Sequence, residues 1–427
     1  MDEALRARLA RGERVLPMGF GEAGVPVAPV LRYALSAATH RNGYGPVAGT
    51  EALRDAAAGY WTRRGLPTTA DDVVCGPGSK ALLFGLLLSL RAAAAADRPV
   101  DVVISRPSWV SYAAQASLTG IRPVRVPVPR GVNGTPAAGG VPDPELLSAA
   151  AREAAAEGRR IGAVIVTLPD NPTGTLAGAE TVTALCEVAR QHDMLIISDE
   201  IYRDLVFAGA RAYTSPAEIV PERTIITSGL SKNLALGGWR LGVARIPGRA
   251  SGGDPVLGAL RTRLLATGSE IWSAPAAPVQ EAAALAFSEI PDITERIRVS
   301  RHLHGAIARA VAARFTAAGA LVAPPQGAFY LYPDFGPHRE TLSGRHGVRT
   351  SADLAALLLD RYGIGVLPGS AFGDPPEELR LRVATSQLYG DKPSQQEAAL
   401  ASNSPAALPW IAPVLDEIAA SLADLVG

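Results

Sequence analysis

The sequence predicts an α/β protein with a large domain, in which helices wrap a mostly parallel sheet, and a smaller α/β domain. Short apolar runs alternate with amphipathic helical patterns from Val73 to Ile246, as expected of strands joined by crossover helices. Polar residues directly follow several of these runs, at the sheet edge where α/β proteins bind ligands. A chain of 427 residues is long enough for two domains, which we place at residues 45–290 and at residues 1–44 with 291–427.

The composition argues against several kinds of partner and site. A formal net charge of +0 and a pI near 7.0 give no electrostatic reason to bind nucleic acid or a membrane surface. The charged N-terminus and the lack of a membrane-length apolar stretch predict a cytoplasmic protein. We expect no metal site, because Cys75, Cys186 and the six histidines are scattered. The cysteines are expected in the core, and the histidines, including His302 and His304, on the surface.

The first part of the chain predicts loops and two helices. A short charged helix precedes a turn-rich loop, Met18–Pro26, which contains Gly21. Helices are predicted at Val30–Thr39 and Thr50–Arg64 from the spacing of their apolar residues. Tyr44 lies in the polar turn between them. A tyrosine in such a turn is expected to be partly buried by packing unless it has a binding role.

An anion site is predicted where a strand meets a helix. Gly78, Ser79 and Lys80 lie between the apolar run Val73–Cys75 and the apolar helix Ala81–Leu90. Glycines before a helix let the backbone approach an anion, and the N–H groups of the first turn favour phosphate. The order of residues differs from a Walker loop, so the site is a phosphate cradle of a generic kind.

Three further apolar runs are predicted as buried strands, each followed by residues that could serve a ligand. The runs and the residues that follow them are Val100–Ile104 with Trp109, Ile161–Leu168 with Asn171, and Met194–Ser198 with Asp199 and Tyr202. Ordinary packing, turn or capping functions would explain each of these residues alone.

Lys232 lies in the stretch Thr224–Gly242, which begins as a β-branched strand and then presents a lysine and Arg240 among small residues. The chain has 3 lysines against 38 arginines (41 basic residues minus 3). A lysine at this place therefore needs a reason specific to its amine. An ammonium can lose its proton and form an imine with a carbonyl, which a guanidinium cannot.

The C-terminal part predicts the smaller domain. Strands are expected at Phe329–Tyr332 and Arg380–Ser386, and a helix at Val348–Arg361. The polar segment Gln387–Pro409 is predicted as a solvated loop. A last helix follows at Trp410–Val426.

The run Gly229–Gly242 resembles the lysine signature of the class I/II aminotransferases, which are fold-type I pyridoxal 5′-phosphate (PLP) enzymes. Matching segments recur in family order from Tyr44 to Ser386. One departure is that many members carry serine three residues before the lysine as a phosphate ligand, where this chain has Gly229. A backbone N–H, Ser228 or Ser231 is available in its place.

The resemblance implies a role for each candidate. Lys232 would hold PLP as an internal aldimine and move the proton between the substrate Cα and the cofactor. The phosphate would be bound by Gly78, Ser79, Lys80, Ser231 and Arg240, and by Tyr44 reaching across a subunit interface. The ring would be held by Trp109, Asn171, Asp199 and Tyr202, with Lys232, Asp199 and Tyr202 as the catalytic residues. Gly21, Asn171 and Arg380 would bind the substrate, Arg380 as a bidentate fork for the α-carboxylate. Arg382, one strand step away on the same face, is the alternative to Arg380.

The resemblance therefore implies a homodimeric aminotransferase with shared active sites that moves an amino group between an α-amino acid and a 2-oxo acid. The same machinery supports other reactions. A γ-eliminating or cyclising enzyme similar to aminocyclopropane-carboxylate synthases is the alternative. Residues 268–273 contain no arginine that would mark a dicarboxylic substrate, so the side-chain specificity stays open.

Overall fold

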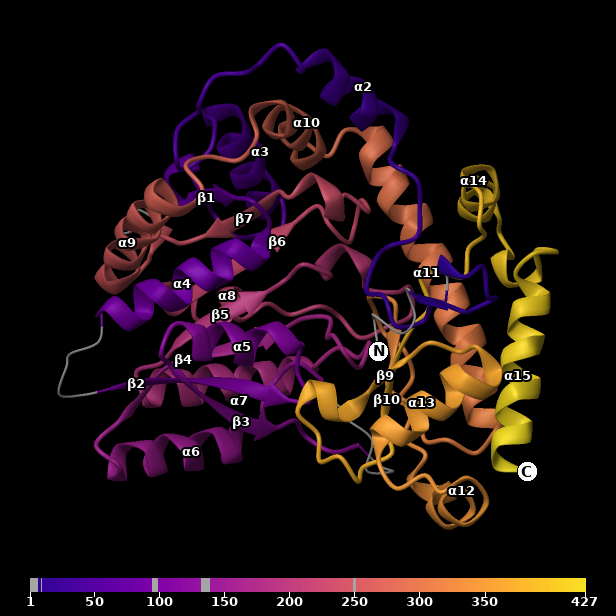
Figure 1. Cartoon of the computed structure of the whole chain (residues 1–427). Coiled ribbons are helices and arrows are strands. Elements are labelled where there is room, and N and C mark those ends of the chain that lie inside the picture. The colour runs from indigo at the N-terminus through magenta and orange to yellow at the C-terminus, as the bar shows by residue number, and fades with distance from the viewer. Residues whose placement is uncertain (1–6, 9, 94–98, 132–138, 249–250) are drawn as a thin grey trace.

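The computed structural model describes residues 7–8, 10–93, 99–131, 139–248 and 251–427 (Figure 1). The predicted charged helix at the N-terminus falls largely outside these residues. The strands are β1 (Val73–Gly76), β2 (Val100–Arg106), β3 (Arg122–Pro127), β4 (Arg160–Thr167), β5 (Leu195–Asp199), β6 (Thr224–Gly229), β7 (Gly242–Arg245), β8 (Tyr330–Leu331), β9 (Leu367–Pro368) and β10 (Leu381–Ala384).

The α-helices of the described residues lie between and after these strands. They are α2 (Pro29–Ala37), α3 (Glu51–Thr62), α4 (Ser79–Ala93), α5 (Val110–Leu118), α6 (Pro144–Ala156), α7 (Ala179–Gln191), α8 (Pro216–Ile219), α9 (Pro255–Ile271), α10 (Ala277–Phe287), α11 (Pro291–Ala317), α12 (Arg339–His346), α13 (Ser351–Tyr362), α14 (Pro393–Ala401) and α15 (Ala412–Val426). No helix in this part of the chain is long and apolar enough to cross a membrane.

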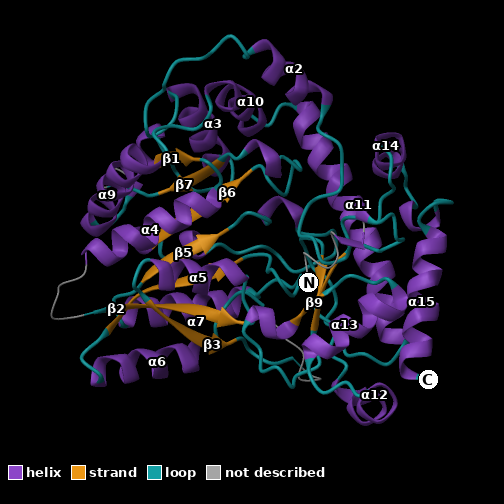
Figure 2. Cartoon of the chain, viewed as in Figure 1, coloured by secondary structure: helices purple, strands orange, loops and turns teal. Residues whose placement is uncertain are grey.

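The main sheet has seven strands in the order β1-β7-β6-β5-β4-β2-β3. The pairs from β6 through β5, β4 and β2 to β3 are parallel, and only β7 runs antiparallel to its two neighbours. Figure 2 shows these strands in orange inside a layer of purple helices. The predicted α/β fold with a mostly parallel sheet is confirmed.

Both faces of the main sheet are buried, as a parallel sheet with crossover helices requires. Successive strand residues point to opposite faces, so Val102 and Ile104 of β2 pack with helices α4, α5 and α9. Val103, between them, packs on the other face with residues of α6 and α7. The helices therefore cover the sheet on both sides.

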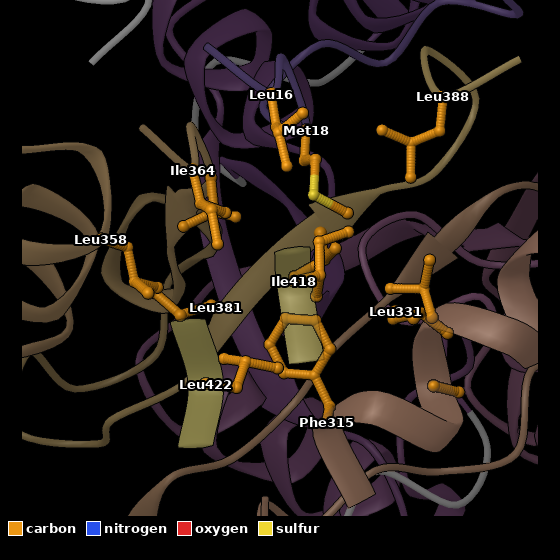
Figure 3. Packing of buried hydrophobic residues seen from close by; sticks show 14 of the residues in the cluster. Leu16, Met18, Phe315, Leu331, Leu358, Ile364, Leu381, Leu388, Ile418 and Leu422 are labelled. Carbon is orange, nitrogen blue, oxygen red and sulfur yellow. The ribbon is translucent and has the colours of Figure 1, made fainter. Parts of the chain in front are cut away.

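The C-terminal part contains a smaller antiparallel sheet in the order β8-β10-β9. Its core is formed with α11, α13 and α15, and includes Phe315, Leu358 and Leu422 (Figure 3). Leu16 and Met18 of the N-terminal arm lie in the same core (Figure 3), and the Leu16 amide donates to the carbonyl of Gly363 at 2.8 Å. The beginning of the chain is thereby fixed to its C-terminal part.

The domain boundaries remain a prediction. Helix α2 lies within residues 1–44, which we assigned to the small domain. In the structure α2 packs on α10, and Leu31 lies in a cluster with residues of α3 and β1.

Two expectations for the C-terminal half are wrong. The segment Gln387–Pro409 is not simply a solvated loop, because it contains helix α14, which packs on α11. His304 is not a surface residue. It is completely buried on α11, whereas His302 is exposed as expected.

Candidate active site

A cavity of about 430 Å³ lies at the carboxyl ends of the parallel strands and is also lined by residues of the small sheet and the N-terminal arm. Ten predicted residues line it: Gly21, Ser79, Lys80, Trp109, Asn171, Asp199, Tyr202, Ser231, Lys232 and Arg240. Eight residues that we did not predict as primary candidates complete the lining: Phe20, Glu22, Tyr112, Thr167, Ile201, Gly237, Tyr330 and Arg382. The topology therefore brings strand ends far apart in the sequence to one place.

Lys232 follows strand β6 and extends into this cavity. Its Nζ donates a hydrogen bond to the Gly21 carbonyl at 2.5 Å and lies 6.0 Å from the ring centroids of Tyr202 and Phe329. Burial, followed by the positive charge of Arg382, lowers the pKa of Lys232 from 10.5 to about 8. The amine is therefore far closer to its neutral, nucleophilic form at physiological pH than an exposed lysine.

Asp199 ends strand β5 as a buried carboxylate. Its Oδ2 accepts a hydrogen bond from the Tyr112 hydroxyl at 2.8 Å, and its Oδ1 accepts one from the Thr227 hydroxyl at 3.3 Å. Burial raises the pKa of Asp199 to about 6, although the Tyr112 hydrogen bond opposes the shift. It forms no salt bridge with the described residues, so a buried negative charge faces the cavity without a cationic partner in contact.

Two pairs of aromatic side chains line the cavity. The hydroxyls of Tyr202 and Tyr330 lie 2.7 Å apart, and both side chains are buried. Trp109 precedes α5, and its ring meets that of Tyr112 edge-on at 5.3 Å. The Lys80 Nζ lies 4.9 Å from the Trp109 ring centroid.

The predicted phosphate cradle is built from close backbone approaches. A Cβ at Gly78, whose φ is +90°, would lie 2.4 Å from the Arg240 Nη2 atom, and a Cβ at Gly242 would lie 2.2 Å from the Ser79 amide nitrogen. Only glycine fits at either position. Arg240 donates to the carbonyls of Gly237 and Pro77 at 2.7 and 3.4 Å and forms no ion pair with a described carboxylate.

The two candidates for the carboxylate-binding arginine, Arg380 and Arg382, differ in where they lie. Arg380 does not line the cavity. Its guanidinium forms ion pairs with Asp334 at 2.9 Å and Asp374 at 3.2 Å, and with Glu378. Arg382 lines the cavity, and its Nη1 donates to the Asn171 Oδ1 at 3.4 Å. The two arginines lie on the same face of the strand, two residues or roughly 6.6 Å apart. Arg382 reaches the cavity, whereas Arg380 lies outside the lining in its ion pairs.

Two other predicted residues lie outside the lining. Gly78 lies directly behind it, against Arg240. Tyr44 is 97% exposed in the turn between α2 and α3, so within one chain it contacts no part of the cavity.

The family of the chain follows from its similarity to known proteins. A sequence model described as "Aminotransferase class I and II" matches residues 20–388. The chain belongs to this family. It is 33% identical over 383 residues to an aspartate aminotransferase of Geobacillus stearothermophilus, with 88% of each chain covered. It is 31% identical over 348 residues to an aspartate/prephenate aminotransferase of Thermus thermophilus, covering 81% of this chain and 79% of the relative.

Solved structures agree with this assignment. The aspartate aminotransferase from Thermus thermophilus with maleate superimposes with a TM-score of 0.77 at 25% identity, and 94% of each chain is covered. That from Rhizobium meliloti gives a TM-score of 0.75 at 25% identity, covering 100% of this chain and 95% of the other. The protein is an aminotransferase of the aspartate aminotransferase-like fold, as the resemblance implied.

Proposed function

We propose that this aminotransferase binds PLP through Lys232 and moves an amino group between an α-amino acid and a 2-oxo acid. One observation carries the proposal. A single cavity contains a lysine whose pKa is lowered to about 8, the buried carboxylate of Asp199 and the guanidinium of Arg240. Neither of the last two groups forms an ion pair with the described residues. These charges suit a ligand that carries a cationic ring N–H at one end and a phosphate at the other.

The residues present fit PLP. Gly78 lets the Arg240 guanidinium, and Gly242 lets strand β7, approach the start of α4 closely, where backbone N–H groups favour a phosphate. Ser79, Ser231 and Arg240 line the same part of the cavity, and we assign them, with Lys80 and Gly78, to the phosphate. Trp109, Asn171 and Tyr202 are assigned to the ring and its hydroxyl, and Asp199 to its nitrogen. When bound, PLP supplies an electron sink for the bonds of the substrate Cα.

Each side chain then has a definite task. Lys232 Nζ would hold the cofactor covalently, and the same amine would remove and return the proton at the substrate Cα. The carboxylate of Asp199 would keep the ring nitrogen protonated, because a nearby anion stabilises the charged form. Arg382 binds the substrate α-carboxylate, beside Asn171. Gly21 covers the substrate from the N-terminal loop.

The substrate class follows from charge and from the relatives. The cavity lining contains four cationic side chains, Lys80, Lys232, Arg240 and Arg382, against the carboxylates Glu22 and Asp199. This balance suits a phosphate together with an anionic substrate. The two relatives described above are named for aspartate and for aspartate and prephenate, so we propose aspartate as the first amino donor to test.

We further propose that the enzyme is a homodimer with shared active sites. Tyr44 is 97% exposed and Ile271, at the end of α9, is 58% exposed. Val47 of the Tyr44 turn lies 3.2 Å from the Cβ position of Gly268 in α9, so both exposed side chains belong to one region. A second copy of the chain that covered this region could place its Tyr44 at the phosphate.

A half-reaction tests the proposed function. Purified enzyme with bound PLP, given a panel of amino acids beginning with aspartate and no oxo acid, should convert the cofactor to pyridoxamine phosphate. Absorbance and mass spectrometry of the released cofactor measure the conversion. If no amino acid produced pyridoxamine phosphate while one lost a side-chain leaving group, the elimination alternative would replace the proposal.

A further inference from the structure

The C-terminal segment after residue 388 lies beyond the part of the chain that the family description matches. It is anchored on α11. The Tyr389 hydroxyl lies 2.5 Å from the His304 Nδ1 atom, and the Trp410 Nε1 donates to the Tyr389 carbonyl at 3.0 Å. Helix α14 (Pro393–Ala401) packs on α11 in the same region. The segment is therefore ordered and packed against α11.

Ser386 and Gln387, directly before this segment, contact residues 19–26, which we call the cavity loop. The Gln387 Nε2 donates to the Glu22 carbonyl at 3.1 Å, and the Ser386 hydroxyl donates to the same oxygen. The Gly24 amide donates to the Ser386 carbonyl at 3.1 Å, and a Cβ at Gly24 would lie 2.1 Å from that carbonyl oxygen. The two backbones thus lie in direct contact.

Helix α14 reaches the far end of the cavity loop through an arginine of α11. Arg296 donates to the Pro26 carbonyl through Nη2, and its Nη1 pairs with the Glu397 carboxylate of α14 at 3.0 Å. The Arg296 side chain is 11% exposed and that of Glu397 is 47% exposed. The contact between Arg296 and the Pro26 carbonyl is therefore shielded from solvent. The Glu397 carboxylate orients the guanidinium from the solvent side.

We propose that Gln387 and the Arg296–Glu397 pair are positioning residues that hold the cavity loop over the active site. Phe20, Gly21 and Glu22 of this loop line the cavity, so a shift of the loop moves the wall that the substrate meets. The kinetic consequence of this inference rests on the proposed function. The position of the loop can be measured independently of that function.

Hydrogen exchange of the intact enzyme measures directly how firmly the cavity loop is held. Gln387→Ala and Arg296→Met each remove a side-chain hydrogen bond to the loop, and methionine keeps much of the apolar stem of arginine. Peptides covering residues 18–26 should exchange about 2- to 10-fold faster in both variants. Arg298→Met is the matched control, because Arg298 lies two residues along α11 and bonds Glu295 at the surface. Unchanged exchange in Gln387→Ala and Arg296→Met, or equal acceleration in Arg298→Met, would overturn the proposal.

Kinetics then separate positioning from general destabilisation. In Gln387→Ala and Arg296→Met, KM for the amino donor should rise by about the same 2- to 10-fold, while kcat and the absorbance of bound PLP stay unchanged. Arg296→Lys keeps a donor for the Pro26 carbonyl and should restore part of the effect. A fall in melting temperature with unchanged KM would contradict a positioning role. If the wild type showed no half-reaction with any amino acid, the proposed function would fail, and the exchange result would still decide whether the loop is held as proposed.

Discussion

Lys232 illustrates how much a local environment changes one side chain. It is one of only 3 lysines in the chain, and its ammonium lies among buried groups, beside the charge of Arg382. These effects oppose protonation, and the carboxylates of Glu22 and Asp199 offset them only in part. The result is an amine with a pKa of about 8 instead of 10.5.

This pKa predicts the pH dependence of cofactor attachment. The neutral amine is the reactive form, so the rate at which PLP attaches to cofactor-free enzyme should rise from pH 6 and level off above about pH 8. A lysine with its ordinary pKa would show a rate still rising beyond pH 9. Stopped-flow absorbance measures the rate. Lys232→Ala should lack any borohydride-reducible link to PLP, and a link found on Lys80 would refute the assignment.

Arg382 and Arg380 give a paired prediction. Arg382→Leu should raise KM for both amino acid and oxo acid by about 10- to 100-fold, because a charge-assisted hydrogen bond to the carboxylate is lost. Arg380→Leu should instead lower the free energy of unfolding by about 1–3 kcal/mol, because it leaves Asp334, Asp374 and Glu378 without their shared cation. Steady-state kinetics and urea unfolding of both variants measure these effects. If Arg380→Leu raised KM and Arg382→Leu only lowered stability, Arg380 would be the carboxylate-binding residue.

Helix α11 connects the sheet-bearing part of the chain to the C-terminal segment, and His304 lies at that connection. Its ring is completely buried against Phe329 and Tyr389, at centroid distances of 5.2 and 5.5 Å. Burial lowers the pKa of His304 from 6.5 to about 3. The folded protein therefore keeps this imidazole neutral under conditions in which the unfolded chain protonates it.

The stability of this connection should depend on pH. Below pH 6.5 the unfolded chain binds a proton at His304 that the folded chain does not, down to about pH 3. The free energy of unfolding should therefore fall as the pH is lowered through this window, by up to about 1.4 kcal/mol per pH unit. His304→Gln should reduce the slope between pH 6 and 4 in urea titrations. The exposed neighbour gives the control, and an equal change in His302→Gln would contradict the prediction.

The sequence was informative for elements whose burial leaves a pattern. Strands β4 and β5 contain continuous apolar runs because both sheet faces are covered, whereas the run of β2 is interrupted near its start by Asp101. The residues after these strands were correctly expected to lie together at one edge. Helix α14 was missed because only Ala399 and Leu400 of it are buried, too few to produce a helical period.

Single side chains were harder to predict than elements. Alternation along β10 places Arg380 and Arg382 on one face, and nothing local tells which of them reaches the cavity. Tyr112 and Tyr330 could not be recognised, because their contacts with Asp199 and Tyr202 join residues 87 and 128 positions apart. Such long-range pairs become visible only in the folded chain.

At the scale of the whole molecule, Tyr44 predicts the assembly. If its hydroxyl serves the phosphate of the neighbouring subunit, the contact is reciprocal and the interface is two-fold. Tyr44→Phe should weaken cofactor retention by about 1.5–3 kcal/mol without lowering the melting temperature. Ultracentrifugation of the wild type should give a dimer.

Subunit exchange provides a stricter measurement of the same contact. Mixing Lys232→Ala with a Tyr44 variant that lacks activity would form heterodimers with one site carrying both lesions and one carrying neither. Part of the activity should return. No recovery after exchange has been confirmed by native mass spectrometry would place Tyr44 outside the partner's site.

The pairing of β6 with β7 limits which residues the chain can accommodate at position 229. Gly229 lies opposite Gly242 in this ladder, and a Cβ at Gly229 would lie 2.8 Å from the carbonyl oxygen of Leu241 and 3.2 Å from the Gly242 Cα atom. A serine at position 229 would therefore require β7 to move. Ser231, which lines the cavity, offers a hydroxyl that needs no such change in the strand.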